Sequence, residues 1–203
     1  MATGAYALSF GALSVTAGLS VLETCALSLL MFTGASQFAF IGVVGAGGNP
    51  WAGAATAALL GTRNGLYGMR LAAILQARGL KRLGAAHFII DETTAMAIAR
   101  ETPADSRYAY WSTAIALFCL WNLGTLIGAI ATHALPDPKV LGLDAAPPAA
   151  FLALLAPRLR AREPVAIALA AAVLALVLLP FLPQGVPLLV IAVLVALTGL
   201  RPR

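Results

Sequence analysis

Charged residues are scarce in this sequence. Asp, Glu, Lys and Arg make up 10% of the 203 residues, whereas hydrophobic residues make up 61%. An average soluble domain carries about 25% charged residues. A soluble fold with so few charges could not cover its surface, so the composition excludes a soluble enzyme, a disordered protein and a nucleic-acid-binding protein. It is typical of a chain embedded in a lipid bilayer.

Cysteine and early basic residues are also rare. Cys25 and Cys119 are the two cysteines, and they form neither a disulfide framework nor a metal-binding motif. We therefore expect no metal ion and no cofactor. The first basic residue is Arg63. Because a secretory signal needs a basic region before its apolar stretch, no signal peptide is expected, and the N-terminus reads as part of the mature membrane protein or of an early-truncated version of it.

Long apolar runs make up most of the sequence. Charges, prolines and glycines divide the chain into stretches at 5–18, 21–46, 51–77, 85–99, 108–134, 148–156, 165–182 and 187–200. A helix needs about 20 mostly apolar residues to cross the hydrocarbon core. The sequence therefore predicts an all-α, polytopic transmembrane helical bundle that forms a single domain over residues 1–203.

Lys and Arg in short loops indicate the orientation, because they favour the cytoplasmic side. Basic loops lie at 76–84, around residue 160 and at the C-terminus, whereas the loops at 45–50 and 136–147 carry little or no net charge. Every loop falls on its expected side only if residues 85–99 do not cross. We predict about seven crossings plus one re-entrant or interfacial segment, in the inner (plasma) membrane, with a cytoplasmic C-terminus.

A short internal repeat is visible. Residues 10–13 (FGAL) resemble residues 127–130 (IGAI), 117 positions later, which suggests repeat halves at 5–77 and 108–182. The same offset lays the glycine-interrupted segment 34–42 over 151–159. Inverted halves with interrupted helices point to the binding site of a secondary transporter. Chains rich in Ala and Gly also produce such matches by chance.

Arg63 lies near the centre of the stretch 51–77. An arginine at the bilayer centre costs at least about 2.5–3.5 kcal/mol, so it should face the bundle interior and have a partner. Tyr67 and Arg70 follow at i+4 and i+7, on the same helix face. This face is predicted to form a polar track. Arg63, Asn64 and Tyr67 are candidates for substrate binding. The alternative is a structural arginine that bonds backbone carbonyls at a broken helix.

Asp91 and Glu92 lie within an otherwise apolar segment. A carboxylate that is removed from water holds its proton more tightly, as proton coupling in a transporter requires. Asp91 and Glu92 are therefore candidates for proton coupling. The structural alternative is an ion pair between one of them and Arg63.

Gly34, Ala35, Ser36 and Gln37 interrupt a hydrophobic helix, and Phe38 follows. Unwound backbone and the positive end of a half-helix dipole suit the carboxylate of an amino acid. Phe38 would then contact an apolar side chain of the substrate. The alternative is a tight packing point. Trp121, Asn122 and Thr125 form a second polar position in a long span, and Asn122 suits either substrate or a neighbouring helix.

Four stretches together resemble the AzlC-type (azaleucine-resistance) branched-chain amino acid permeases: LLMFTGASQF at 29–38, TRNGLY at 62–67, FIIDET at 88–93 and the run 136–160. Gly61 stands where many members have Asn, and Ile90 where many have Thr. The resemblance implies an inner-membrane exporter of valine, leucine and isoleucine, and in some members of methionine. It also implies a small hydrophobic AzlD-type partner and efflux driven by the proton motive force.

Two other functions fit parts of the sequence. An intramembrane serine hydrolase would use Ser36 as nucleophile and His87 or His133 as base. A membrane subunit without transport of its own is the second alternative. Because neither histidine is expected near the middle of the membrane with Ser36, we interpret the chain as a transporter and not as an enzyme.

Overall fold

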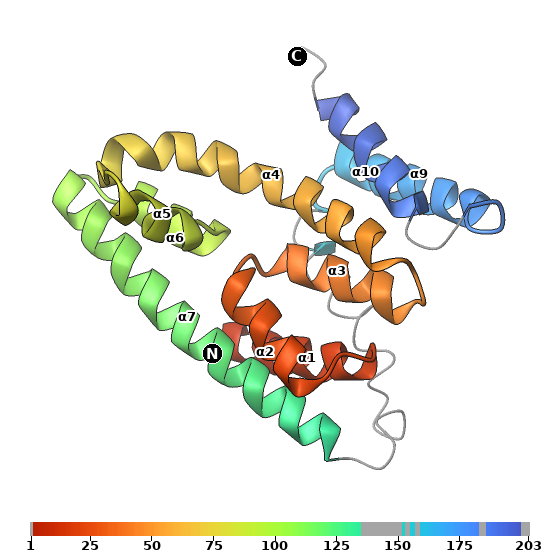
Figure 1. Cartoon of the computed structure of the whole chain (residues 1–203). Coiled ribbons are helices and arrows are strands. Elements are labelled where there is room, and N and C mark those ends of the chain that lie inside the picture. The colour runs from red at the N-terminus through yellow and green to blue at the C-terminus, as the bar shows by residue number, and fades with distance from the viewer. Residues whose placement is uncertain (1, 135–151, 153–154, 157–158, 183–185, 200–203) are drawn as a thin grey trace.

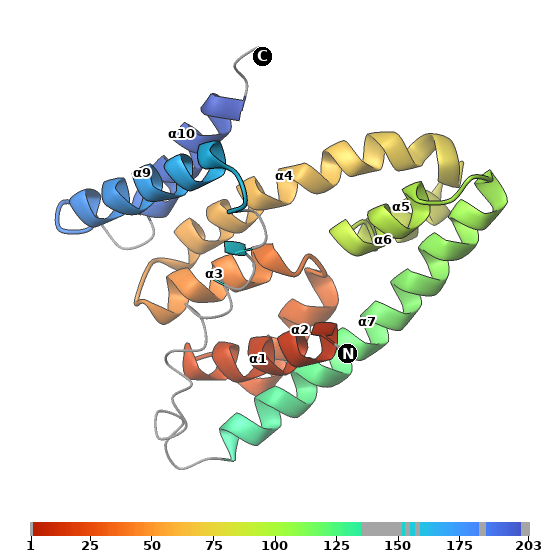
Figure 2. The same ribbon diagram turned by 180° about the vertical axis from the view of Figure 1, so that it is seen from behind.

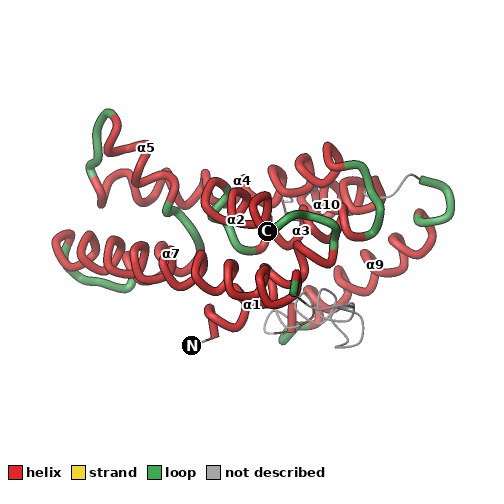
Figure 3. Tube along the Cα trace, turned by 60° about the horizontal axis from the view of Figure 1, so that its bottom comes forward, coloured by secondary structure: helices red, strands yellow, loops and turns green. Residues whose placement is uncertain are grey.

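The computed structural model describes residues 2–134, 152, 155–156, 159–182 and 186–199, and these residues form helices and turns without a strand (Figure 3). This confirms the all-α prediction. The helices are α1 (Ala2–Thr16), α2 (Val21–Leu30), α3 (Ala35–Gly45), α4 (Pro50–Leu75), α5 (Leu80–His87), α6 (Asp91–Ile98), α7 (Pro103–His133), α9 (Arg162–Leu178) and α10 (Val186–Gly199).

Two long helices, α4 and α7, enclose the helices α1, α2, α3, α5 and α6, whereas α9 and α10 lie on the other side of α4 (Figure 1). The short helices α5 and α6 lie near the C-terminal end of α4 and the N-terminal half of α7, whereas α1 and α2 lie along the C-terminal half of α7. Helix α3 packs on the N-terminal half of α4. Helices α9 and α10 pack on each other, and α10 contacts α4 (Figure 2).

Helix α7 is long and apolar enough to cross a membrane, and within the described residues no other helix meets both conditions. Residues 85–99 form no continuous helix, because α5 and α6 have eight residues each. At 1.5 Å per residue each is only about 12 Å long. The seven crossings and the cytoplasmic C-terminus stay predictions. The loop 136–147, most of the segment 148–156 and residues 201–203 lie outside the described residues.

Glycine brings α1 and α7 into close contact. A Cβ atom on Gly11 would overlap the backbone carbonyl oxygen of Thr125, and one on Gly128 would overlap that of Leu8. These glycines occupy equivalent positions in the FGAL and IGAI stretches. The contact is reciprocal, because Leu8 and Thr125 are also separated by 117 positions. Two-fold-related repeats produce this pattern, and the larger repeat halves stay a prediction.

The predicted helix interruption is confirmed. Helix α2 ends at Leu30 and α3 begins at Ala35, and Gly34 has a φ of 63°, which other residues rarely adopt. The Gln37 side chain holds the break together. Its Oε1 accepts from the Gly34 N–H at 3.1 Å, and its Nε2 donates to the Leu27 carbonyl at 3.3 Å.

Candidate functional site

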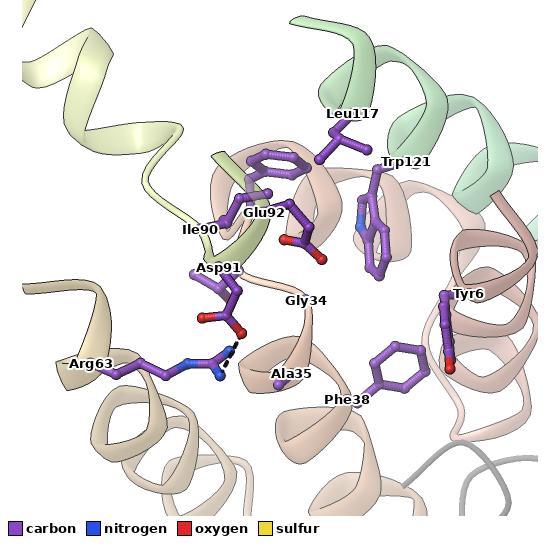
Figure 4. A pocket seen from close by; sticks show the side chains of 12 residues that line it. Tyr6, Gly34, Ala35, Phe38, Arg63, Ile90, Asp91, Glu92, Leu117 and Trp121 are labelled. Carbon is purple, nitrogen blue, oxygen red and sulfur yellow. Dashed lines mark ion pairs between the residues drawn. The ribbon is translucent and has the colours of Figure 1, made fainter. Parts of the chain in front are cut away.

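A cavity of about 240 Å³ opens at this helix break (Figure 4). Its lining comes from α1, the segment between α2 and α3, the helices α3, α4, α6 and α7, and the residue before α6: Tyr6, Phe32, Thr33, Gly34, Ala35, Phe38, Arg63, Ile90, Asp91, Glu92, Leu117 and Trp121. Charged side chains lie on one side of the cavity, and aromatic rings lie on the other (Figure 4).

An ion pair joins α4 to α6 at the charged wall. Arg63 Nη1 lies 2.8 Å from Asp91 Oδ2, as Figure 4 shows. The expectation that Arg63 has a partner is therefore confirmed. The two side chains are 26% and 38% exposed, so the pair is open to the cavity. Arg63 Nε and Asp91 Oδ1 are shielded but make no hydrogen bond within the described residues, so both groups have capacity for a further partner.

Thr93 positions Asp91 at the start of α6. The Thr93 side chain is fully buried. Its hydroxyl accepts from the Ile90 N–H at 3.1 Å and donates to the Phe88 carbonyl at 2.7 Å. These bonds fix the turn before α6, and Asp91 is then the first residue of the helix, where the helix dipole favours a negative charge. The FIIDET stretch thus contains a positioning residue that the sequence analysis missed.

Glu92 adds a second carboxylate to the same wall. Its side chain points into the cavity between Asp91 and Trp121 (Figure 4). Glu92 makes no ion pair with any residue in the described part of the chain. The Glu92 side chain is exposed, so a cationic group of a ligand in the cavity could reach it.

The aromatic wall contains Tyr6, Phe38 and Trp121, and the rings of Phe38 and Trp121 pack against the buried ring of Phe10. Phe10 and Trp121 stack with centroids 6.0 Å apart, and Phe38 meets both rings edge-on at 5.6 and 6.3 Å. The indole N–H of Trp121 is buried without a hydrogen-bond partner in the described structure. Buried indole N–H groups usually have a partner, and one without it is costly. This donor lies in a side chain that lines the cavity, where an acceptor on a ligand could meet it.

The structure brings six of the eleven predicted site residues together around the cavity: Gly34, Ala35, Phe38, Arg63, Asp91 and Glu92. Ser36, Gln37, Asn64, Tyr67 and Asn122 do not line it. Gln37 instead caps the helix break, and Asn122 donates to the Phe118 carbonyl in its own helix at 2.8 Å. Helical register explains both placements, because neighbouring residues on a helix point about 100° apart.

Six lining residues were not among the predicted site residues: Tyr6, Phe32, Thr33, Ile90, Leu117 and Trp121. Most of them are apolar or aromatic, and such residues look the same in a sequence whether they face a cavity or a packed core. The break at Gly34 was a signal for neighbouring Phe32 and Thr33. Ile90 directly precedes the predicted Asp91. Tyr6, Leu117 and Trp121 come from distant helices, and only tertiary packing places these three here.

Ser36 has no catalytic partner in the described structure. Its hydroxyl is buried and makes no hydrogen bond there. His87 instead lies among aromatic rings, with its centroid 5.2 Å from that of Phe88 and 5.9 Å from that of Phe118. His133 is the last residue of α7. A hydrolase requires the nucleophile and the base within hydrogen-bond reach, and this arrangement does not favour that alternative.

Comparisons with known proteins agree with the sequence motifs. The family described as AzlC protein matches residues 1–135. The inner membrane protein YgaZ of Escherichia coli (strain K12) is 33% identical over 128 residues, which cover 61% of this chain and 52% of that protein. The chain thus spans about half the length of this curated relative. No solved structure matches the chain.

Proposed function

Because the chain belongs to the AzlC family, we propose that it is a membrane transport protein, a permease, whose substrate occupies the cavity beside Arg63. The observation that supports this most directly is the ion pair of Arg63 and Asp91 facing a cavity at a broken helix. Membrane transporters build substrate sites at such breaks. The relative described as an inner membrane protein and the apolar composition support the membrane location.

The proposed substrates are the branched-chain amino acids valine, leucine and isoleucine, with methionine as a further candidate. The cavity is smaller than the about 300–1,000 Å³ typical of drug-sized ligands, so it suits a small molecule. Glu92 would meet the substrate ammonium group, and Arg63 and the start of α3 would meet its carboxylate. Phe32, Phe38 and Leu117 would contact the aliphatic side chain.

We propose that export is coupled to protons through the ion pair. A substrate carboxylate that binds Arg63 competes with Asp91 for the same guanidinium. Uptake of a proton by Asp91 would remove its charge and release Arg63 to the substrate. The exposure of the pair to the cavity gives both the substrate and water access to it. Glu92, in the same wall, is the second candidate for this proton.

A small hydrophobic AzlD-type membrane subunit is the proposed partner. Along α7, large apolar side chains are exposed, among them Ile115, Leu123 and Ile130 at 52–58%. Lipid or a second apolar membrane protein would cover such a surface. When the chain is co-expressed with a tagged AzlD-type subunit, affinity purification of that subunit from detergent extracts should therefore also isolate the chain.

The function is tested by efflux from cells loaded with dipeptides. Cells that produce the chain together with the AzlD-type subunit are loaded with valine-, leucine- or lysine-containing dipeptides, and amino acids in the medium are followed. We expect faster efflux of valine and leucine than in cells without the chain, and unchanged efflux of lysine. Equal efflux of all three, or none above background, would count against the proposal. Omitting the subunit distinguishes a transporter from a subunit without transport of its own.

Replacement of Asp91 by Asn is expected to uncouple efflux from the proton gradient. The amide keeps the shape of the carboxylate but cannot take up a proton. Valine efflux by this variant should lose its dependence on external pH and on a protonophore, both of which should act on the unchanged chain. If pH-dependent efflux persists in Asp91→Asn, Asp91 has no coupling role, and Glu92→Gln is then the informative variant.

Replacement of Trp121 by Phe should weaken substrate binding and leave the maximal rate nearly unchanged. Phe keeps an aromatic ring against Phe10 and Phe38 but lacks the N–H donor. Loss of one hydrogen bond costs about 0.5–1.5 kcal/mol, so we expect about a two- to tenfold higher KM for efflux. Trp111→Phe is the control, because Trp111 lies on the same helix outside the cavity. An equal KM for both variants would contradict a ligand contact at Trp121.

A further inference from the structure

A second apolar cavity lies between the C-terminal half of α4 and helix α5. It has a volume of about 250 Å³, and its lining includes Gly65, Gly68, Leu75, Ala86 and Ile89. The adjoining space of about 510 Å³ is lined by Ala72, Gln76, Ala77, Arg78 and Arg82. Ala72, Ala77 and Arg82 line both spaces. The two therefore form one groove, with an apolar inner part and a polar, basic mouth.

Small residues and a tight turn create this groove. A Cβ atom on Gly65 would meet no atom within 4 Å, so the groove is open there. Leu71 and Ala85 are buried and form its floor. Beyond α4, Gln76 and Gly79 adopt positive φ values of 50° and 55°. This turn reverses the chain, so that α5 returns beside α4 (Figure 1). Arg78 and Arg82 line the mouth of the groove.

The mouth carries uncompensated positive charge. Arg78 and Arg82 are exposed, and neither makes an ion pair in the described part of the chain. No acidic residue lines either space. The sequence itself has no Asp or Glu between Glu23 and Asp91. Guanidinium groups bind phosphate oxygens through two parallel hydrogen bonds, so two of them at one mouth favour a phosphate-containing ligand.

We propose that this groove binds an anionic phospholipid, with its phosphate on Arg78 and Arg82 and one acyl chain along the apolar part. A free phosphate would use the arginines but would leave the apolar groove beside them without a role. An amphiphile uses both parts. Basic pockets between membrane helices are known to hold anionic lipid head groups. The proposal rests on the membrane location proposed above and does not depend on transport.

Lipid retention by the purified full-length chain tests this site. The chain is isolated from membranes in detergent, mixed with phosphatidylglycerol or phosphatidylcholine of identical acyl chains, and analysed by native mass spectrometry. We expect phosphatidylglycerol to be retained about tenfold or more over phosphatidylcholine, because each arginine near an anionic head group contributes about 1 kcal/mol and about 1.4 kcal/mol is a tenfold difference in affinity. The Arg78→Gln/Arg82→Gln variant should lose this preference.

Matched variants separate this site from general charge effects. Arg160→Gln/Arg162→Gln removes the same charge outside both spaces and should keep the preference. Gly65→Leu places a side chain in the apolar part and should lower the retention of both lipids, whereas Gly84→Leu, on α5 outside the lining, should not.

Three results would overturn the lipid site: equal retention of both lipids by the unchanged chain, an equal loss in the Arg160/Arg162 variant, or full competition by glycerol phosphate without acyl chains. The last result would identify a site for soluble phosphates. Recovery of the chain in the soluble fraction would instead contradict the membrane location. Selective lipid retention without amino-acid efflux from dipeptide-loaded cells would contradict transport and leave the lipid site supported.

Discussion

Replacement of Arg63 by Gln is expected to abolish valine efflux. Arg63 is the cation of the ion pair at the cavity wall, and in the proposed mechanism it also receives the substrate carboxylate. A glutamine can donate a hydrogen bond but provides no charge for either carboxylate. We expect at least about a tenfold loss of efflux, which corresponds to about 1.4 kcal/mol. Efflux from dipeptide-loaded cells, normalised to the amount of protein in the membrane, measures it.

Two further variants show whether the loss reflects substrate binding or folding. Arg63→Gln leaves Asp91 as a partly buried charge without a partner, which lowers stability. Arg63→Gln/Asp91→Asn removes both charges and should restore the amount of folded protein, but it should not restore efflux. Arg70→Gln is the matched control, because Arg70 lies seven residues further along α4, is exposed and does not line the cavity. Efflux at the normal rate in the Arg63 variants would contradict the proposed site.

The helix break and the charged wall could be predicted from local sequence. Glycine next to polar residues in an apolar run predicts an interruption, because the backbone gains freedom there and the side chains seek hydrogen bonds. Arg63 near the middle of an apolar stretch predicts a partner, because an unpaired charge is costly in hydrocarbon. Asp91 and Glu92 are the two acidic residues near enough in the sequence pattern to be its partner, and Asp91 forms the ion pair.

The aromatic wall could not be predicted in the same way. Trp121 and Tyr6 are distant in the sequence from Gly34, and only the packing of α1 and α7 around the break brings them to one cavity. Gln37 shows the opposite limit. From the sequence alone, a polar residue at a helix break is equally consistent with ligand binding and with helix capping. In the structure Gln37 forms hydrogen bonds with Gly34 and Leu27 and therefore caps the break.

Replacement of Gly128 by Ala is expected to separate α1 from α7 and to destabilise the protein. The added methyl group would overlap the backbone carbonyl of Leu8, and backbone cannot move aside as a flexible side chain can. Overpacking of this kind costs typically about 1–3 kcal/mol. We expect a clearly lower Tm in detergent. The Tm is measured from the fraction of protein that stays monodisperse in size-exclusion chromatography after heating to a series of temperatures. Gly11→Ala should behave in the same way, because its methyl group would overlap the Thr125 carbonyl.

The separation should also reach the cavity, because α1 and α7 supply its aromatic wall. Phe10 on α1 stacks on Trp121 of α7, and Tyr6 lines the cavity from the same helix as Gly11. Gly128→Ala should therefore lower efflux even at a temperature where the protein remains folded. Gly65→Ala is the control, since its methyl group enters open space and alanine favours a helix. The Tm of Gly65→Ala should be unchanged or higher than that of the unchanged chain. Equal Tm values for Gly128→Ala and Gly65→Ala would contradict the close contact between α1 and α7.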